Sequence, residues 1–267
     1  MYSINGIALN EGHTGWRVLR SGTQTQGGVT KTISKVGSPG RPGYVPAPTT
    51  YTEQILVFNV RTPRARLDEL LALCADAHTL TRTDDATREA YVELVSAIPG
   101  GEAVLDSVFD VTVTLSVYEG VWRDVDEVIF GAASITTPSQ GFELFPALSA
   151  PIFDADIFIR GVFGEFTLTD SGGSTLKTTR AWPGLSTTGL LWIGSTQQAF
   201  RANESDPWTP VADASQYVDT SGNGGFRFTP KLVSGNPANR RAEVTLVTLT
   251  QTSTTLRVRG KRAYRMN

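Results

Sequence analysis

The chain has 267 residues, of which 40% are hydrophobic and 19% are charged, the composition of an ordinary globular protein with one large or two medium domains. A net charge of −2 and an isoelectric point near 5.8 exclude a strongly basic nucleic-acid-binding protein. No apolar run is long enough to cross a bilayer, and the single cysteine, Cys74, excludes an intrachain disulfide framework. We therefore expect a chain made in a reducing cytoplasm and stabilised by packing alone.

Residues 21–52 are rich in Gly, Thr and Pro and are too many for an ordinary connection inside a compact domain. The β-branched run 29–36 is typical of a strand, and a glycine pair and a Gly-Ser-Pro-Gly turn flank it. We predict a long β-hairpin arm, with a disordered loop as the alternative. An isolated two-stranded ribbon is marginal in water, so the arm needs a partner surface, most simply a second copy of the chain. Its candidate inter-subunit contacts are Val29, Ile33, Val36 and Tyr44.

One amphipathic helix is predicted over residues 63–78. Thr62 supplies an N-cap, and Pro63 occupies the first helical position. Apolar residues then recur at helical spacing, with charged residues around the rest of the cylinder. This stripe consists of Leu67, Leu70, Leu71, Cys74 and His78.

Most of the remaining N-terminal sequence is predicted to be strand. Residues 55–60 form an apolar run that leads into the helix, and residues 91–98 form a second strand that ends at a Pro-Gly-Gly turn. The clearest pattern covers residues 109–117, where apolar and polar side chains alternate strictly. A period of two predicts that one face of this strand is buried and the other is exposed to water.

The sequence loses its periodicity after residue 131. We predict an N-terminal domain of residues 1–131, a linker of residues 132–140, and a C-terminal domain of residues 141–267. Short strand-like segments recur in the second domain with turns between them, which favours a β-sandwich. These segments are residues 157–161, 165–169, 190–193, 226–228, 244–250 and 255–260, the last two as a hairpin.

Residues suited to catalysis or metal binding are few. The two histidines, His13 and His78, stand in a turn and at the end of the helix, and no spacing brings carboxylates or Cys74 to either of them. The segment GGSTLKT at 172–178 resembles a phosphate-binding loop but has Leu176 where that motif needs glycine, so we interpret it as a hairpin turn. The paired aspartates, such as Asp154 and Asp156, offer too few ligands for calcium. We predict no catalytic residue, no metal site and no cofactor.

Two surface hypotheses remain for the C-terminal domain. An exposed tryptophan among Trp182, Trp192 and Trp208 could stack on a sugar ring, although core packing of Trp192 and loop anchoring by the other two are the simpler interpretations. Basic residues also gather near the end of the chain. They form a candidate interface to an acidic partner or a surface beside DNA, with a solvated strand face as the alternative: Arg257, Arg259, Lys261 and Arg262.

The order of these parts resembles the distal tail (Dit-like minor tail) protein family of long-tailed, non-contractile bacteriophages. A short N-terminal strand with SINGIAL is followed by a β-rich arm, a strand, one helix, more strands and the segment VWRDV at 121–125. The segment PIFDADIFIRGVFGEFTLTDSGGSTLKTT at 151–179 is similar to the opening strands of that family's galectin-like domain. The ending LRVRGKRAYRM at 256–266 is similar to minor tail proteins of phages that infect actinobacteria.

The resemblance implies a mainly β fold: a tail-tube-like sandwich or split barrel with one helix and an extended β arm, followed by a galectin-like β-sandwich. It also implies a non-enzymatic virion component at the tail tip. There a homo-oligomeric ring, a hexamer in the family, joins the tail-tube protein to the tip hub, and DNA passes through in transit only. Two alternatives stay open: a β-sandwich that binds host-surface polysaccharide for adhesion, and a tail-tube or baseplate protein of a phage-derived particle.

Overall fold

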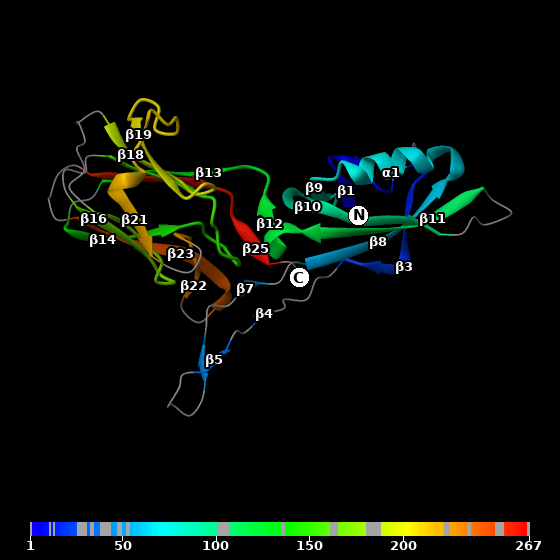
Figure 1. Ribbon diagram of the computed structural model, residues 1–267, viewed down its shortest axis with the longest axis horizontal. Coiled ribbons are helices and arrows are strands. Elements are labelled where there is room, and N and C mark those ends of the chain that lie inside the picture. The colour runs from blue at the N-terminus through cyan, green and yellow to red at the C-terminus, as the bar shows by residue number, and fades with distance from the viewer. Residues whose placement is uncertain are drawn as a thin grey trace. The chain divides into compact units, whose positions relative to one another are not determined.

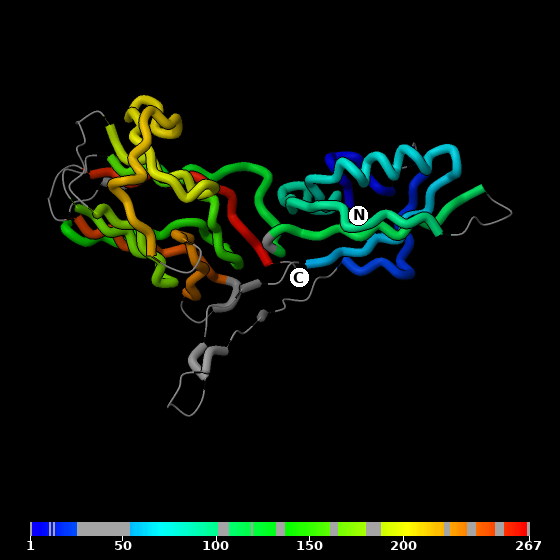
Figure 2. The backbone as a smooth tube through the Cα atoms, in the orientation of Figure 1, coloured from blue at the N-terminus to red at the C-terminus, as the bar shows by residue number. Residues whose placement is uncertain are grey.

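The computed structural model describes residues 2–10, 12, 14–25, 31–32, 35–37, 44–46, 50–51, 54–100, 107–134, 137–160, 165–179, 188–221, 225–233, 236–248 and 254–265. The chain divides into two compact units, whose backbone courses are traced in Figure 2. Unit 1 comprises Met1–Val125 and Tyr264–Asn267, and unit 2 comprises Asp126–Ala263. Within the described ranges, no helix is long and apolar enough to span a membrane.

Unit 1 contains an antiparallel sheet of nine strands in an open path, so the described strands do not close a barrel. Its order is β2-β1-β9-β10-β11-β8-β3, with β12 pairing β10 and β25. The long strand β10 pairs β9 and β12 through its first half and β11 through its second half, with a register shift between Leu94 and Ser96. The strands are β1 Tyr2–Ile4, β2 Ile7–Ala8, β3 Arg17–Gln24, β8 Gln54–Pro63, β9 Thr79–Arg82, β10 Asp85–Pro99, β11 Val108–Val117, β12 Val121–Asp124 and β25 Ala263–Arg265.

The predicted helix is present but shorter than residues 63–78. A 3-10 turn, η1 Arg64–Arg66, precedes the α-helix α1 Leu67–Ala75, and neither has a side-chain N-cap. Thr62 cannot cap the helix because β8 continues through Pro63, which pairs with Val108 of β11. The acidic first turn of α1 still complements the positive end of its dipole.

Helix α1 covers one face of the unit 1 sheet, as Figure 1 shows. Its fully buried residues, Leu70 and Cys74, share a core with inward side chains of β8 and β11. The alternation predicted for 109–117 is confirmed from residue 111 onward, since its apolar positions there are fully buried: Val111, Val113, Leu115 and Val117. Polar Ser116 is buried as well, which strict alternation does not predict.

Unit 2 consists of two six-stranded antiparallel sheets that face each other in Figure 1. One has the order β13-β24-β15-β18-β19-β20, and the other has the order β14-β23-β16-β17-β21 with β22 beside β23. The first sheet contains β13 Val128–Ser134, β15 Asp156–Arg160, β18 Thr188–Ile193, β19 Gln198–Asn203, β20 Ala212–Asp213 and β24 Thr255–Gly260. The second contains β14 Ser139–Leu144, β16 Phe166–Asp170, β17 Thr175–Thr178, β21 Val218–Ser221, β22 Pro230–Val233 and β23 Asn236–Thr248. Two further 3-10 turns are η2 Tyr118–Gly120 in unit 1 and η3 Ser215–Tyr217 in unit 2.

Aromatic side chains connect the interior of unit 2. The ring of Phe145 makes edge contacts with Phe130 of β13 and with Phe228, at centroid distances of 4.8 and 5.3 Å. Phe226 contacts Phe228 in the same way. Such edge-to-face pairs each add roughly 0.5–1.5 kcal/mol beyond the burial of their area. The turn predicted at 170–173 is also present and joins β16 to β17, with Gly173 in the left-handed region at φ 86°.

Three sequence interpretations differ from the structure. The segments at 244–250 and 255–260 are not a hairpin, because β23 and β24 lie in different sheets. Phe226 and Phe228 are buried, but residues 226–228 are not a strand, and only Phe228 among them makes a bridge, to Ile152. From the sequence, residues 128–131 are expected at the end of the N-terminal domain and residues 132–134 in the linker. In the structure these residues form β13, which pairs with β24 in unit 2. Backbone pairing needs no side-chain periodicity, so the small residues of β13 left no signal in the sequence.

Candidate interaction surfaces

The arm is predicted at 21–52, but its first residues belong to β3, which pairs with β8 in the main sheet through Gln24. The remainder contains four described strand segments. Strand β4 Lys31–Thr32 pairs antiparallel with β7 Thr50–Tyr51, and β5 Lys35–Gly37 pairs antiparallel with β6 Tyr44–Pro46. The second pair is nested inside the first in sequence, which is the order of one antiparallel hairpin. Of the four candidate contact residues, Val36 pairs with Val45 and Tyr44 pairs with Gly37, whereas Val29 and Ile33 lie outside the described residues.

The basic residues of the C-terminal sequence lie on and just after β24. Arg257 and Arg259 alternate with the buried Leu256 and Val258, so both project from the outer face of their sheet. Lys261 and Arg262 follow the strand and are partly buried.

Arg259 makes its principal contacts within its own unit. Its Nε and Nη2 atoms donate hydrogen bonds to Asp156 Oδ2 at 2.9 and 2.8 Å. Its guanidinium also lies 4.8 Å from the centroid of the Trp208 ring, within the range of a cation–π contact. Arg259 therefore fixes β24 to β15 and to the loop after β19, as well as contributing to the charge of the surface.

The tryptophans of unit 2 are engaged in packing where the structure describes them. Trp192 of β18 is 4% exposed. Trp208 packs against a small cluster on the outer face of the same sheet, formed by Phe158, Leu191 and Ala202, and Arg259 lies over its ring. Trp182 lies outside the described residues. Trp208 is thus a loop anchor, and a sugar ring would have to compete with the arginine for its face.

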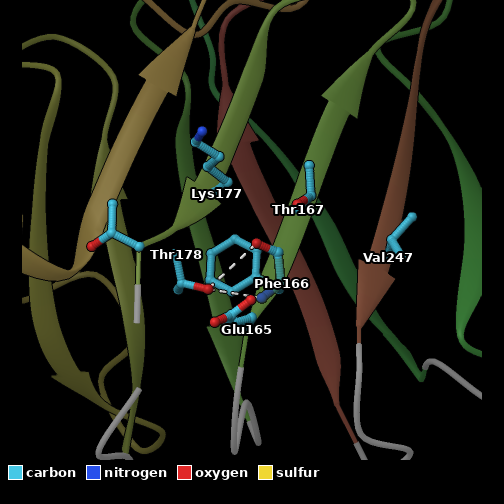
Figure 3. A pocket seen from close by; sticks show the side chains of 7 residues that line it. Glu165, Phe166, Thr167, Lys177, Thr178 and Val247 are labelled. Atoms are coloured by element: carbon cyan, nitrogen blue, oxygen red, sulfur yellow. Dashed lines mark hydrogen bonds between the residues drawn. The ribbon is translucent and has the colours of Figure 1, made fainter. Parts of the chain in front are cut away.

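A hollow of about 450 Å³ lies on the outer face of the other sheet, across β16, β17 and β23, as Figure 3 shows. Lys177 and Thr167 stand at its side, and Lys177 lies 3.5 Å from Asp219. Thr178 Oγ1 accepts a hydrogen bond of 2.8 Å from the backbone N–H of Phe166. Phe166 is the one aromatic residue among the described lining residues and is buried, so these residues offer no exposed ring on which a sugar could stack.

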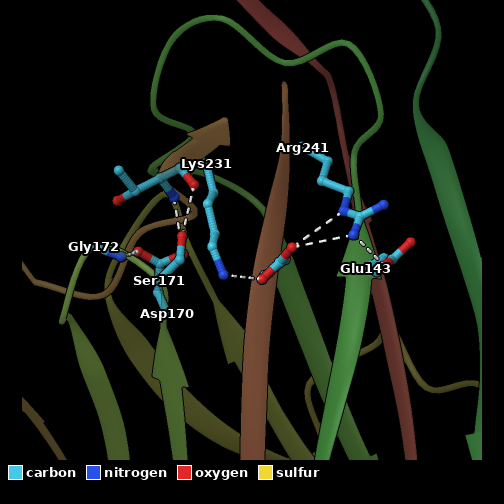
Figure 4. A network of polar contacts seen from close by, with 8 residues as sticks. Glu143, Asp170, Ser171, Gly172, Lys231 and Arg241 are labelled. Carbon is cyan, nitrogen blue, oxygen red and sulfur yellow. Dashed lines mark hydrogen bonds and ion pairs between the residues drawn. The ribbon is translucent and has the colours of Figure 1, made fainter. Parts of the chain in front are cut away.

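A charged network covers the neighbouring part of the same sheet, shown in Figure 4. Glu143 of β14 lies directly opposite Glu243 of β23, and Arg241 contacts both carboxylates. Lys231 of β22 contacts Glu243 at 2.5 Å, and this hydrogen bond is the main cause that lowers the pKa of Glu243. The two cations offset a like-charge pair that would otherwise destabilise the pairing of these strands.

The 170–173 turn is attached to the segment 227–229 by side chains (Figure 4). The buried carboxylate of Asp170 accepts hydrogen bonds from the backbone N–H groups of Gly172 at 2.7 Å and Thr229 at 2.9 Å. Burial raises the pKa of Asp170, because desolvation disfavours its charged form. Ser174 Oγ donates to the carbonyl of Arg227 at 2.9 Å. The segment that resembles a phosphate-binding loop in sequence is therefore a structural turn.

Unit 1 has an open groove of about 780 Å³ at the C-terminal end of α1. Asp76 and His78, which follow the helix, line it together with Tyr91 and Glu93 of β10 and Tyr118 of η2. The phenol of Tyr118 donates a 2.7 Å hydrogen bond to Glu93 Oε2. All five side chains are exposed, so the groove presents two carboxylates and two phenol rings to solvent.

The structure brings no catalytic constellation together within its described residues. No three His, Cys, Asp or Glu side chains among them gather at metal-binding distance. His78 lies beyond the end of α1 with Nδ1 3.0 Å from the carbonyl of Asp76, and His13 lies outside the described residues. Cys74 is fully buried, and burial raises the pKa of its thiol to about 11. A thiol of this kind is a packing element at neutral pH.

Comparison with solved structures identifies the fold. The chain is similar to the Dit protein of phage SPP1, described as a paradigm of the hub adsorption apparatus of phages that infect Gram-positive bacteria. The TM-score is 0.50 at 15% identity, over 91% of this chain and 93% of that chain. A weaker similarity, with a TM-score of 0.33 at 11% identity, covers 92% of this chain and 90% of a chain in the activated phage P2 baseplate with Ca. No family profile and no curated protein sequence matches the chain. The mainly β fold with one short helix, and the structural resemblance to a Dit protein, are thus confirmed.

Proposed function

We propose that this chain is a structural component of a phage tail tip, where copies of it form a ring that joins the tail tube to the hub or baseplate and lets DNA pass. The observation that carries the proposal is the fold similarity to the SPP1 Dit protein, which extends over nearly the full length of both chains. A similarity of that extent covers both units in their order along the chain, rather than a single β-sandwich that many proteins share.

The arm supports self-association. The pairs β4–β7 and β5–β6 are nested in sequence and form two-stranded sheets separate from the main sheet of unit 1. A ring built by one kind of contact uses two different patches on each subunit, and an arm that reaches a neighbour supplies one of them. The proposed partners are further copies of the chain, six in all, the tail-tube protein and the tail-tip hub protein.

The C-terminal unit enters the proposal as a galectin-like sandwich. Neither described tryptophan of this unit favours polysaccharide binding, because Trp192 is buried and Arg259 lies over the ring of Trp208. The proposed role is non-enzymatic and uses no cofactor. Its location is the virion tail tip, after synthesis in the cytoplasm of the host bacterium.

Light scattering across a concentration series tests the proposal. Six copies of the 28.8 kDa chain weigh roughly 170 kDa, and a closed ring holds one mass over a wide range of concentration. A mass that instead grows continuously with concentration would indicate stacking into tubes. A monomer in the presence of the tube and hub proteins would contradict a ring.

Deleting residues 27–43 gives a matched test of the arm. We expect the deletion to abolish ring formation and to leave a folded monomer, because no strand of the main unit 1 sheet falls within the deleted range. Circular dichroism checks the fold of the variant, and light scattering measures its mass. A deletion variant that still forms rings rules out the arm as the ring contact.

A further inference from the structure

Part of the outer face of the main sheet of unit 1 is exposed, and that part carries apolar side chains. Helix α1 packs on the inner face with the buried residues of β8 and β11. On the outer face, Ile98 of β10 is 61% exposed, and Val95 and Ile55 are about half exposed. Tyr91 and Tyr118, at one end of this surface, are 37% and 49% exposed. An exposed apolar patch that borders polar residues is typical of an interaction site.

The groove at the C-terminal end of α1 adds negative charge to one end of this surface. Glu93 and Asp76 place two carboxylates beside the two phenol rings. Tyr118 uses one of the roughly four acceptor positions of the Glu93 carboxylate, which leaves that group able to accept donors from a ligand. The C-terminal end of a helix adds partial negative charge at the same place. The buried guanidinium of Arg123, 5.9 Å from the Tyr91 ring, is 2% exposed and does not present its charge to solvent.

This combination fits a basic, extended polypeptide. An ammonium or guanidinium group gains from the carboxylates by charge-assisted hydrogen bonds and from the phenol faces by cation–π attraction. The chain itself has two basic stretches that could serve. In the C-terminal stretch, Arg259 is held by Asp156 and Trp208, and Lys261 and Arg262 also interact within their own chain.

The arm is the better match. Residues 21–52 contain three basic residues, Lys31, Lys35 and Arg41, and no Asp or Glu, so the stretch has a net charge of +3. Lys31 belongs to strand β4 and Lys35 to strand β5, so two of the three basic residues lie in the paired strands of the arm. The arm thus combines positive charge with the β-branched composition that an exposed apolar sheet face can accommodate.

We propose that the groove of Asp76, His78, Tyr91, Glu93 and Tyr118 receives the arm of a second copy of this chain, with Lys31 or Lys35 paired to Glu93. This inference rests on the proposed function, because it names the acceptor surface of the ring contact. It assigns the two patches of that contact to separate parts of the sequence, the arm and the end of α1.

A charge-exchange experiment on the full chain tests the pairing. We expect Glu93→Lys, and separately the double variant Lys31→Glu, Lys35→Glu, to raise the concentration at half assembly by at least about tenfold, since facing like charges repel across an interface. The three substitutions combined restore opposite charges, and we expect assembly to recover. Glu165→Lys, an exposed glutamate in unit 2, is the control and leaves assembly unchanged. Light scattering gives the masses, and circular dichroism verifies that each variant is folded.

Failure of this inference is distinguishable from failure of the ring. Rings that persist in Glu93→Lys, or variants that the combination does not rescue, overturn the groove assignment while the ring remains. If the wild type by itself is a monomer, its mass does not report on the groove, and the groove is tested by titrating a fluorescent peptide of residues 27–52 into the full chain. Binding that weakens at least about tenfold in Glu93→Lys supports the groove. Absence of binding at millimolar peptide overturns it.

Discussion

Replacing Arg241 by glutamine tests whether the charged network holds β14 and β23 in register. Arg241 contacts both Glu143 and Glu243, which face each other across the strand pair, and Lys231 contacts Glu243 alone. Arg241→Gln keeps much of the side-chain length and removes the charge. It removes the cation that contacts Glu143, which then lies directly opposite a second carboxylate.

The expected loss follows from the exposure of the groups. Two partly exposed ion pairs contribute about 0.2–1 kcal/mol each, and directly opposed like charges cost a similar amount. We therefore expect Arg241→Gln to lower the free energy of opening at β14 and β23 by about 1–2 kcal/mol at low salt. At 1 M salt the Debye length is about 3 Å, so most of this difference should disappear.

Hydrogen–deuterium exchange with mass spectrometry measures the effect locally, because peptides from β14 and β23 are read separately from those of unit 1. Glu143→Gln in the Arg241→Gln background removes the repulsion, and we expect it to recover about half of the loss. The mechanism is refuted if Glu143→Gln recovers no stability in the Arg241→Gln background, since the two glutamates would then not repel each other. Glu243 adds a pH signature. Its folded pKa is lowered, chiefly by Lys231, so its contribution is present above the unfolded pKa and is lost as the pH falls through the folded value.

Three further predictions concern buried groups and the tryptophans. We expect Asp170→Asn to lower the free energy of unfolding in urea by about 1–3 kcal/mol, because the single amide oxygen cannot accept both backbone hydrogen bonds. Burial raises the folded pKa of Asp170, so the wild type loses stability as the pH rises through that value. A variant with the same pH dependence as the wild type would contradict this origin. Cys74, with its pKa raised to about 11, should react with iodoacetamide at pH 7.5 only after unfolding in urea, and rapid native alkylation would contradict its burial. Titration with bacterial wall polysaccharide to millimolar sugar should leave tryptophan fluorescence unchanged, because Trp192 is buried and Arg259 covers Trp208; a saturable change would revive the adhesion hypothesis.

Sequence reasoning located elements well where one pattern decided them. The alternation over 109–117 predicted β11, and the stripe containing Leu70 and Cys74 predicted α1 and its buried face. The ends of the helix were less accessible, because pairing of Pro63 with β11 decides where the helix begins. That pairing is a tertiary hydrogen bond pattern and leaves no mark in the local sequence.

Topology was the harder problem. Two adjacent strand-like segments at the end of the chain indicated a hairpin, yet β23 and β24 belong to opposite sheets. Sequence neighbours usually pair, but a sandwich also needs connections that pass from one sheet to the other. The basic residues of β24 illustrate the consequence for a candidate site. Arg259 is paired with Asp156, a contact that spans 103 positions in the sequence and depends on β15 lying beside β24.

The exposed apolar residues on the outer face of the unit 1 sheet could not be identified from the sequence. A strand with period two predicts one buried and one wet face, but Tyr91, Val95 and Ile98 of β10 are apolar residues on the exposed side. Sequence alone cannot tell such residues from core residues, since both are hydrophobic and both lie in a strand. The structure separates them because α1 covers only the inner face. In the proposed contact, the basic arm and the acidic groove meet either between two copies of the chain or within one copy. The charge-exchange variants decide between these two cases, since only a contact between copies changes the mass.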